Sequence, residues 1–249
     1  MVNLFILNVD LKENARLLND RHLGKSRLET KQIINVLEGK SEGYKNHTAV
    51  LSWKDYIPAL KIYYNFIIRE WISRGFKNNM ELYDINEKYY IITSYFDGIK
   101  TVFYEEKQED DVTVFPWWVG WWPFIQSHRA AVLRKKPDYY SHFYNEDLIP
   151  YLKYGYVWPN RLKNDILTNF TMEAFDGLGT GCPPIFTIPR EELLKWNENR
   201  FVNPKTNRKI TEKGTIYIFY LKGYNELIDL NNKSDIYKMI YQIIWNIKI

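Results

Sequence analysis

Hydrophobic residues recur at helical spacing in the first part of the chain. Asp10 and Glu13 stand three residues apart and resemble a capping box, which predicts that a helix begins there. Farther along, the aliphatic side chains of this helix share one stripe, which contains Leu23, Ile33, Ile34 and Leu37. Gly24 interrupts the pattern. Because glycine costs about 1 kcal/mol relative to alanine inside a helix, its presence predicts a bend or the close approach of another group.

A second helical pattern precedes Gly75, a residue type that commonly ends a helix. Large apolar side chains recur there at helical spacing and are interpreted as core, namely Trp53, Tyr56, Leu60, Tyr63, Tyr64 and Ile67. Farther on, Pro189 followed by residues 190–196 predicts a short helix. Residues 215–220 are β-branched or aromatic and predict a strand, and a last helix is predicted over about 235–247.

These elements predict two domains. Residues 1–165 are expected to form a mainly α N-terminal domain, and residues 166–249 a small α+β C-terminal module. With 249 residues, of which 45% are hydrophobic, the chain is long enough to bury a substantial core in either domain arrangement. No apolar run approaches the roughly 18 residues of a membrane span, and the start lacks the pattern of a signal peptide. A soluble, intracellular protein is expected.

The content of cysteine and histidine bears on metals and cofactors. Cys182 is the single cysteine, so an internal disulfide and a cysteine-rich zinc site are excluded. The four histidines are scattered along the sequence without ligand-like spacing, and no nucleotide-binding or hydrolase motif is present. We therefore expect neither a metal nor a cofactor. The formal charge of +4 is small, so any attraction to nucleic acid has to come from clustered cations.

One cluster lies on the polar side of the first helix. Arg21, Lys25 and Glu29 are spaced i, i+4 and i+8 and fall within an arc of about 80°. His22 stands one heptad before Glu29 and falls beside it. A carboxylate among cations is suited to an enzyme that works on DNA. The alternative is an ordinary solvated helix face, where such pairs contribute about 0.2–0.5 kcal/mol.

A second cluster combines rings and cations. Residues 115–124 contain four tryptophans, including Trp117 and Trp118, and two prolines with Gly120 interrupt regular structure there. A basic run follows directly and includes His128, Arg129, Arg134 and Lys135. Rings beside cations suit a surface that stacks on bases and holds phosphates. The alternative is a buried tryptophan cluster with a solvated basic helix behind it.

Several blocks of sequence resemble one family. Asp20, His22, Leu23 and Glu29 match the signature helix of the pyrimidine-dimer DNA glycosylases, the phage-type endonuclease V family. Bacterial and viral relatives of that family resemble the chain at further blocks in the same order: Gly24-Lys25-x-Arg27-x-Glu29, Asn46-His47-x-Ala49-Val50-x-x-Trp53, Arg69-Glu70-Trp71-x-x-Arg74-Gly75, Pro116-Trp117-Trp118, Ser127-His128-Arg129-x-x-x-Leu133-Arg134-Lys135 and Tyr156-Val157-Trp158-Pro159. The resemblance covers about residues 1–165.

The resemblance implies a glycosylase with an associated AP lyase activity on damaged double-stranded DNA. In the family, the α-amine of the processed chain attacks the sugar of a pyrimidine dimer and forms an imine, which here assigns the amine to Val2 and the neighbouring carboxylate to Glu29. An α-amine titrates near pH 7.7–8.0, so much of it is already unprotonated at neutral pH. The N-terminal arm is longer than in the phage proteins, and Asn3 replaces an expected arginine. An oxidised or ring-opened purine is the alternative lesion.

The remaining assignments by resemblance concern binding. Arg21, Lys25 and Arg27 are expected to hold phosphates that flank the lesion, with His22 beside them. Trp117 and Trp118 are expected to fill the gap left by a flipped nucleotide or to stack on the extruded base. His128, Arg129, Arg134 and Lys135 complete the predicted DNA-binding set. Lys25 is the alternative nucleophile, but a neighbouring carboxylate favours the charged form of an ammonium, so the terminus is preferred.

The C-terminal module resembles a different motif. The string Asn203-Pro204-x-Thr206-x-Arg208-x-Ile210 is similar to a short adaptor motif in proteins of large DNA viruses, which normally carries two cysteines. This resemblance implies a viral protein, a protein partner for the module, and a place in the cytoplasm or nucleus of an infected host or in virions. The alternative function is therefore a catalytically silent viral DNA-binding or adaptor protein on the same fold.

Overall fold

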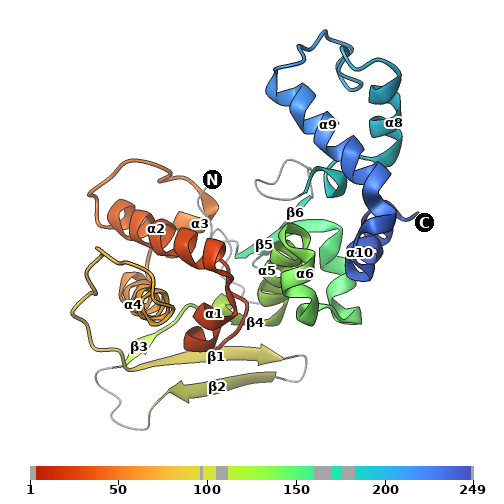
Figure 1. Ribbon diagram of the computed structural model, residues 1–249. Helices are drawn as coiled ribbons and strands as arrows, with labels where there is room; N and C mark the ends of the chain where they lie inside the picture. Colours follow the sequence, from red (N-terminus) through yellow and green to blue (C-terminus); the bar gives the residue numbers. More distant parts are fainter. Residues whose placement is uncertain (1–3, 96–97, 105–111, 160–169, 175–182, 248–249) are drawn as a thin grey trace. The chain divides into compact units, whose positions relative to one another are not determined.

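The computed structural model of the protein describes residues 4–95, 98–104, 112–159, 170–174 and 183–247. The described chain is mostly helical, with a few short strands (Figure 1). Its contacts divide it into two compact units: unit 1 contains residues 1–129 and 156–172, and unit 2 contains residues 130–155 and 173–249. The units interleave along the chain, so the single boundary expected near residue 165 stays a prediction. None of the described helices combines the length and apolar character needed to cross a membrane.

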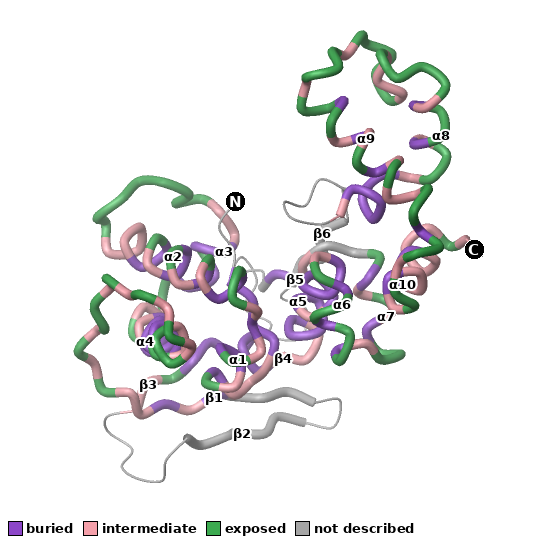
Figure 2. Tube along the Cα trace, viewed as in Figure 1, coloured by how far each residue is buried: buried purple, intermediate pink, exposed green. Residues whose placement is uncertain are grey.

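The core of unit 1 is built around α4 (Ile57–Ser73), which has Pro58 in its first turn. α1 (Leu11–Leu17) and α2 (Asp20–Leu37) pack against α4, and α3 (Thr48–Leu51) contacts α2. α4 is buried along most of its length, as its purple trace shows (Figure 2). It ends at Ser73, and Gly75 follows with a φ of +81°, a left-handed conformation that suits glycine. The helix predicted before Gly75 is confirmed, although Trp53 and Tyr56 lie ahead of its first residue.

The prediction of one helix running on from Asp10 was wrong, because two helices form. The Asp10 side chain caps α1 by accepting from the backbone N–H groups of Lys12 (2.9 Å) and Glu13 (3.1 Å). Leu18 is then extended, and Asn19 caps α2 by accepting from the N–H of His22 (2.8 Å). An asparagine side chain competes with the backbone for hydrogen bonds and therefore favours a new helix start over a helix interior.

A four-stranded sheet completes unit 1. Its central strand β1 (Tyr89–Tyr95) pairs antiparallel with β2 (Gly98–Tyr104), with Tyr89 opposite Tyr104. The same strand pairs in parallel with β3 (Thr113–Val114) and β4 (Gly120–Trp121). Buried Tyr89 carries the sheet onto α4, because its ring lies 5.8 Å from that of Phe66. β5 (Tyr154–Pro159) and β6 (Phe170–Ala174) form a separate two-stranded sheet.

α5 (Trp122–Lys135) runs from unit 1 into unit 2. The described helices of unit 2 that follow it are α6 (Pro137–Tyr140), α7 (Ile149–Leu152), α8 (Arg190–Glu198), α9 (Thr215–Ile228) and α10 (Asp235–Trp245), with short 3₁₀ turns η3 (Ser141–Phe143), η4 (Glu146–Leu148), η5 (Pro184–Phe186) and η6 (Asp229–Asn232) between them. The predicted short helix after Pro189 and the last helix are confirmed as α8 and α10.

The strand predicted over residues 215–220 was wrong, because these residues form the first turns of α9. Tyr217 and Tyr220, three residues apart, turn one face toward Trp196 of α8, with ring centroids 5.4 and 5.8 Å away. Gly223 continues this face and lets Ile188 and Leu193 approach. Within the described residues 183–247, the β structure is a single bridge between Val202 and Lys209. The expected C-terminal module of residues 166–249 also contains strand β6, so its α+β description stays a prediction, although its described part is mostly helical.

Candidate functional site

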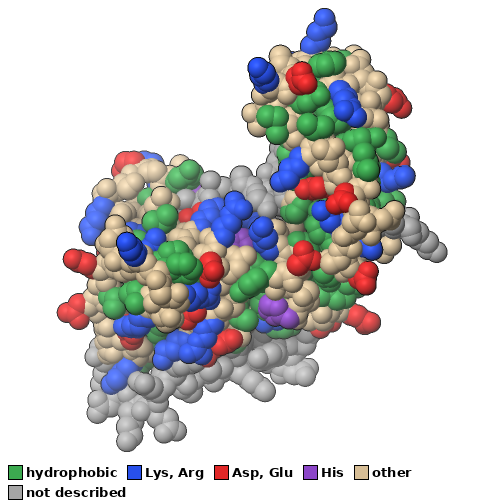
Figure 3. All heavy atoms as spheres, in the orientation of Figure 1, with side chains coloured by type: hydrophobic (Ala, Val, Ile, Leu, Met, Phe, Trp, Pro, Cys, Tyr) green, Lys and Arg blue, Asp and Glu red, His purple; other side chains and the backbone are tan. Residues whose placement is uncertain are grey.

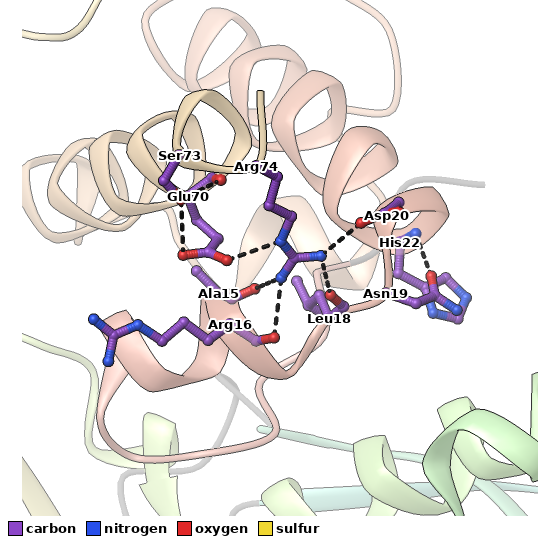
Figure 4. Close-up of polar contacts among 9 residues, drawn as sticks. All are labelled: Ala15, Arg16, Leu18, Asn19, Asp20, His22, Glu70, Ser73 and Arg74. Carbon is purple, nitrogen blue, oxygen red and sulfur yellow. Dashed lines mark hydrogen bonds and ion pairs between the residues drawn. The ribbon is translucent and has the colours of Figure 1, made fainter. Parts of the chain in front are cut away.

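The corner between α1 and α2 is held by one side chain, that of Arg74 just after α4 (Figure 4). Its Nε donates to the Glu70 carboxylate (2.8 Å) and its Nη1 to the Asp20 carboxylate (2.9 Å). It also donates to three carbonyl oxygens at the end of α1, those of Leu18 (2.8 Å), Arg16 (3.0 Å) and Ala15 (3.3 Å). Burial opposes the charge, but the hydrogen bonds with Glu70 and Asp20 raise the pKa of Arg74. The start of α2 is thereby fixed against α4.

One face of α2 is committed to packing against α4. A Cβ at Gly24 would lie 2.9 Å from the Trp71 ring, so the predicted close approach to the backbone of Gly24 is confirmed. The Arg27 guanidinium lies 4.5 Å from the centroid of the same ring, and its Nη1 donates to the Asn78 side chain (3.2 Å). Arg27 was predicted to hold phosphate. Its contacts are intramolecular, and the phosphate role stays a prediction.

The other face of α2 carries the predicted carboxylate and two cations. The Glu29 side chain is only 8% exposed and pairs with Lys25, whose Nζ lies 3.3 Å from Oε1. The Lys25 side chain is 48% exposed and Arg21 is exposed, so both cations lie at the surface, and Lys25 contacts the buried carboxylate. Lys and Arg side chains are prominent over the part of unit 1 that contains α2 (Figure 3). The face thus combines an accessible positive rim with a desolvated acid.

The N-terminal segment lies beside this helix. Residues 4–7 are buried, and the Phe5 ring lies 5.1 Å from the ring of His22 on α2. His22 is itself buried and lies seven residues before Glu29, which is two turns along the same stripe. Val2 and Asn3 lie outside the described residues, so the assigned nucleophile stays a prediction.

Comparison with known proteins gives one finding that bears on this helix. Residues 2–84 match the family of pyrimidine dimer DNA glycosylases. The match contains α1, α2, α3 and α4, and with them Glu29 and the Arg74 corner. No match was found among curated proteins or among solved structures. The family resemblance expected to continue to about residue 165 is therefore supported as far as residue 84, and the later blocks stay a prediction.

Beyond the segment that matches the glycosylase family, the tryptophan block is partly core. Trp118, in the 3₁₀ turn η2 (Trp117–Val119), is buried, and its ring lies 4.8 Å from Trp53 and 4.8 Å from Phe124. A buried ring packed on both sides is not displayed for stacking on a base. The side chain of Trp117 falls outside the described part of the structure, and its role stays a prediction.

His128 and Arg129 at the middle of α5 contact the N-terminal segment. His128 is fully buried, and its Nδ1 accepts from the backbone N–H of Ile6 (2.9 Å). Arg129 donates from Nε to the carbonyl of Leu7 (2.8 Å), and its guanidinium lies 5.1 Å from the Trp122 ring. Burial lowers the pKa of Arg129. These contacts hold Ile6 and Leu7 in place, and the DNA contacts predicted for both residues stay a prediction.

Arg134, in unit 2, is 4% exposed and caps the end of α7. Its Nη1 donates to the carbonyl oxygens of Tyr151 (2.8 Å) and Leu152 (3.1 Å). Helix C-termini leave carbonyls without intrahelical partners, so a cation there is stabilising. Lys135 is half-buried beside it. The DNA-binding role predicted for Arg134 has no exposed surface to support it, and that of Lys135 stays a prediction.

The structure brings in residues that the sequence analysis did not single out. Glu70, Trp71 and Arg74 orient the helix that carries Glu29, and they were named only as part of a matching block. Their i, i+1 and i+4 spacing on a helix was the available signal, because it predicts an ion pair and an adjacent ring. Asn14 and Tyr63, which bind the N-terminal segment, gave no such signal. Across the described residues, no three His, Cys, Asp or Glu side chains gather as a metal site would require.

Proposed function

We propose that this protein is a DNA glycosylase with AP lyase activity that acts on damaged double-stranded DNA, with pyrimidine dimers as the substrate. The observation that carries the proposal is the desolvated Glu29 carboxylate together with the exposed Arg21 and Lys25, on a helix inside the segment that matches the glycosylase family. The exposed cations suit the phosphates on either side of a lesion.

The proposed reaction begins at the α-amine of Val2, after removal of Met1. The amine nitrogen attacks the sugar C1′ as the glycosidic bond breaks, and the base leaves with its bonding electrons and a proton. Loss of the second amine proton with opening of the sugar ring gives an imine, which a tertiary nitrogen could not form. Removal of a C2′ proton then drives β-elimination of the 3′ phosphate. Water finally hydrolyses the imine and frees the amine.

Glu29 serves this reaction in two ways. Positive charge develops at C1′ as the base departs, and a carboxylate in a site shielded from water stabilises that charge more strongly than one in solvent. During elimination the same group accepts and returns protons. Before DNA binds, the Lys25 ammonium pairs with this carboxylate, with its Nζ 3.3 Å from Oε1.

The first prediction tests Glu29. Glu29→Gln keeps the size and shape of the side chain but removes its charge and its ability to take up a proton, so we expect DNA affinity to hold while strand cleavage falls by about 10²- to 10⁴-fold. The measurement is single-turnover cleavage of an oligonucleotide with one dimer. Glu38→Gln is the matched control, since Glu38 lies at the end of the same helix and pairs with Lys40 and Lys61. Cleavage by Glu29→Gln at the wild-type rate would remove Glu29 from the mechanism.

The second prediction tests the nucleophile. Borohydride should trap a covalent adduct with lesion DNA, and acetylation of the α-amine should prevent it, whereas Lys25→Ala should still form it. Peptide mapping then locates the DNA. An adduct on Lys25 with the terminus free contradicts the assignment to Val2. A protein that shifts lesion DNA in a gel but gives neither adduct nor cleavage is the alternative, a silent viral DNA-binding or adaptor protein.

A further inference from the structure

The N-terminal segment is bound on one side by a buried polar pair from α1 and α4. Asn14 accepts at Oδ1 from the N–H groups of Leu7 and Asn8 (3.3 Å for the latter) and donates from Nδ2 to the Phe5 carbonyl (3.1 Å). The Tyr63 hydroxyl donates to the same carbonyl (3.1 Å) and accepts from Asn14. Both side chains are fully buried, and burial raises the pKa of Tyr63, which keeps the hydroxyl protonated as a donor.

α5 also binds the segment. His128 Nδ1 accepts from the Ile6 N–H (2.9 Å), and Arg129 Nε donates to the Leu7 carbonyl (2.8 Å). A slip of one residue would move the bonded backbone groups of Phe5, Ile6 and Leu7 away from these partners. Each buried group left without a partner costs about 1–3 kcal/mol, so the register of residues 5–8 is strongly specified.

Chain length makes this register matter for the proposed reaction. Val2 precedes Phe5 by three residues, which span at most about 10 Å when extended. The Phe5 ring lies against His22, and Glu29 follows His22 by seven residues, a rise of about 10.5 Å along α2. Because Val2 precedes Phe5 by only three residues, the position of Phe5 limits where the amine of Val2 can lie. A register slip of one residue would move the start of this short arm by about 3.3 Å.

We propose that Asn14, Tyr63 and His128 are positioning residues that fix the N-terminal segment so that the α-amine meets the sugar beside Glu29. The inference rests on the proposed function, since it takes the amine as the nucleophile. None of the three touches the reacting atoms. Their effect is on the orientation of the amine, and misplacement by about 1 Å costs on the order of 10²-fold in rate.

The experiment compares variants that remove a bond with variants that keep it. Tyr63→Phe deletes one hydroxyl, and Tyr64→Phe is its control, because Tyr64 is equally buried on α4 but donates to the Glu81 carbonyl. His128→Leu removes the acceptor for Ile6, whereas His128→Asn keeps an acceptor near the position of Nδ1. For each, the rate of borohydride trapping at saturating lesion DNA, the Kd for that DNA and the Tm are measured.

We expect Tyr63→Phe and His128→Leu to slow trapping about 10- to 100-fold with Kd nearly unchanged, and the two control variants to trap at close to the wild-type rate. Equal trapping rates in all variants would contradict the positioning role but would leave the proposed function intact. If the trapping rate falls and the Kd for lesion DNA rises in the same variants, the residues stabilise the fold in general and do not position the amine. If His128→Leu does not fold, Tyr63→Phe decides the question. A wild-type protein that gives no adduct contradicts the proposed function itself, and the positioning role with it.

Discussion

The cations of α2 and those of α5 occur in similar sequence patterns but have different partners. Arg21 and Lys25 on α2 remain at the surface, with Lys25 over the Glu29 carboxylate. On α5, Arg129 donates to the backbone carbonyl of Leu7. Arg134 donates to the backbone carbonyls of Tyr151 and Leu152. Only the first set is arranged to meet a phosphate from outside.

A run of basic residues in the sequence does not reveal whether each cation faces solvent or binds backbone carbonyls. An arginine that caps the end of a short helix finds its acceptors in the backbone, which is the same for every residue type and leaves no mark in the sequence. Arg74 and Arg134 both serve this purpose, at the ends of α1 and α7. A carboxylate partner, by contrast, is visible as a residue type at a helical spacing.

The largest effect expected from this comparison is on stability, at Arg134. Arg134→Met should lower the free energy of unfolding by about 2–4 kcal/mol, because two buried carbonyls lose their donor. Urea denaturation measures the change. Lys136→Met is the control, since Lys136 is exposed two residues later and should change stability by less than about 0.5 kcal/mol. If Arg134→Met is as stable as the wild type but binds DNA more weakly, Arg134 is a DNA contact and not a structural residue.

The next largest effect is expected on DNA binding, where Arg21→Ala should remove about one phosphate contact. If Arg21 binds a phosphate, Arg21→Ala should lower the slope of log K against log salt by about 0.9 on all DNA sequences, with stability nearly unchanged. Titration of labelled DNA at several salt concentrations measures the slope. Arg16→Ala is the control, because Arg16 lines a pocket with Lys12, Phe66 and Arg69 and not the α2 face. Equal slopes for Arg21→Ala and the wild type would leave the α2 cations as a solvated face.

The smallest expected effect is the loss of stability at low pH. It distinguishes arginines that bind carboxylates from arginines that bind backbone carbonyls. Burial of Glu87 opposes its ionisation, but hydrogen bonds from Arg69 (2.6 and 2.7 Å) and Asn65 outweigh it and lower its pKa. Stability from this pair is therefore present above the unfolded pKa of about 4.5 and is lost as pH falls through the lower folded value. At an exposed pair the contribution is no more than about 1 kcal/mol.

The measurement is urea denaturation at pH 7 and at pH 3. The difference in unfolding free energy between wild type and Glu87→Gln should shrink toward zero at pH 3, whereas the difference between wild type and Arg134→Met should persist, because carbonyls do not titrate. A Glu87→Gln difference that stays constant over this range would show that the pair does not contribute through its charge.

Much of the helical content could be predicted from the sequence, and its exceptions have physical causes. The stripe of α2 and the glycine after α4 follow from local periodicity and backbone conformation, and both appear as predicted. The first turns of α9 contain strand-forming residues, yet Tyr217 and Tyr220 pack on Trp196 and impose a helix. Pairing of β1 with β3 and β4 depends on contacts distant in the chain, which periodicity does not encode.

The candidate site divides in the same way. The relation of Lys25 to Glu29 follows from helix geometry, so it could be predicted. The burial of Glu29, His128 and Arg134 could not, because it depends on which elements cover them. Gly24 is intermediate: its presence predicts a close approach, but only the structure identifies Trp71 as the group that approaches.

The contacts of Arg74 predict which positions should be kept together in relatives of this protein. Arg74 joins Asp20 and Glu70 to the end of α1, so loss of Arg74 removes a donor from both carboxylates and from three carbonyl oxygens. These three positions should therefore change together during evolution. Glu29 does not belong to that set and can be lost by itself. Relatives that keep Asp20, Glu70 and Arg74 but lack Glu29 would be chains that retained the fold and gave up the chemistry.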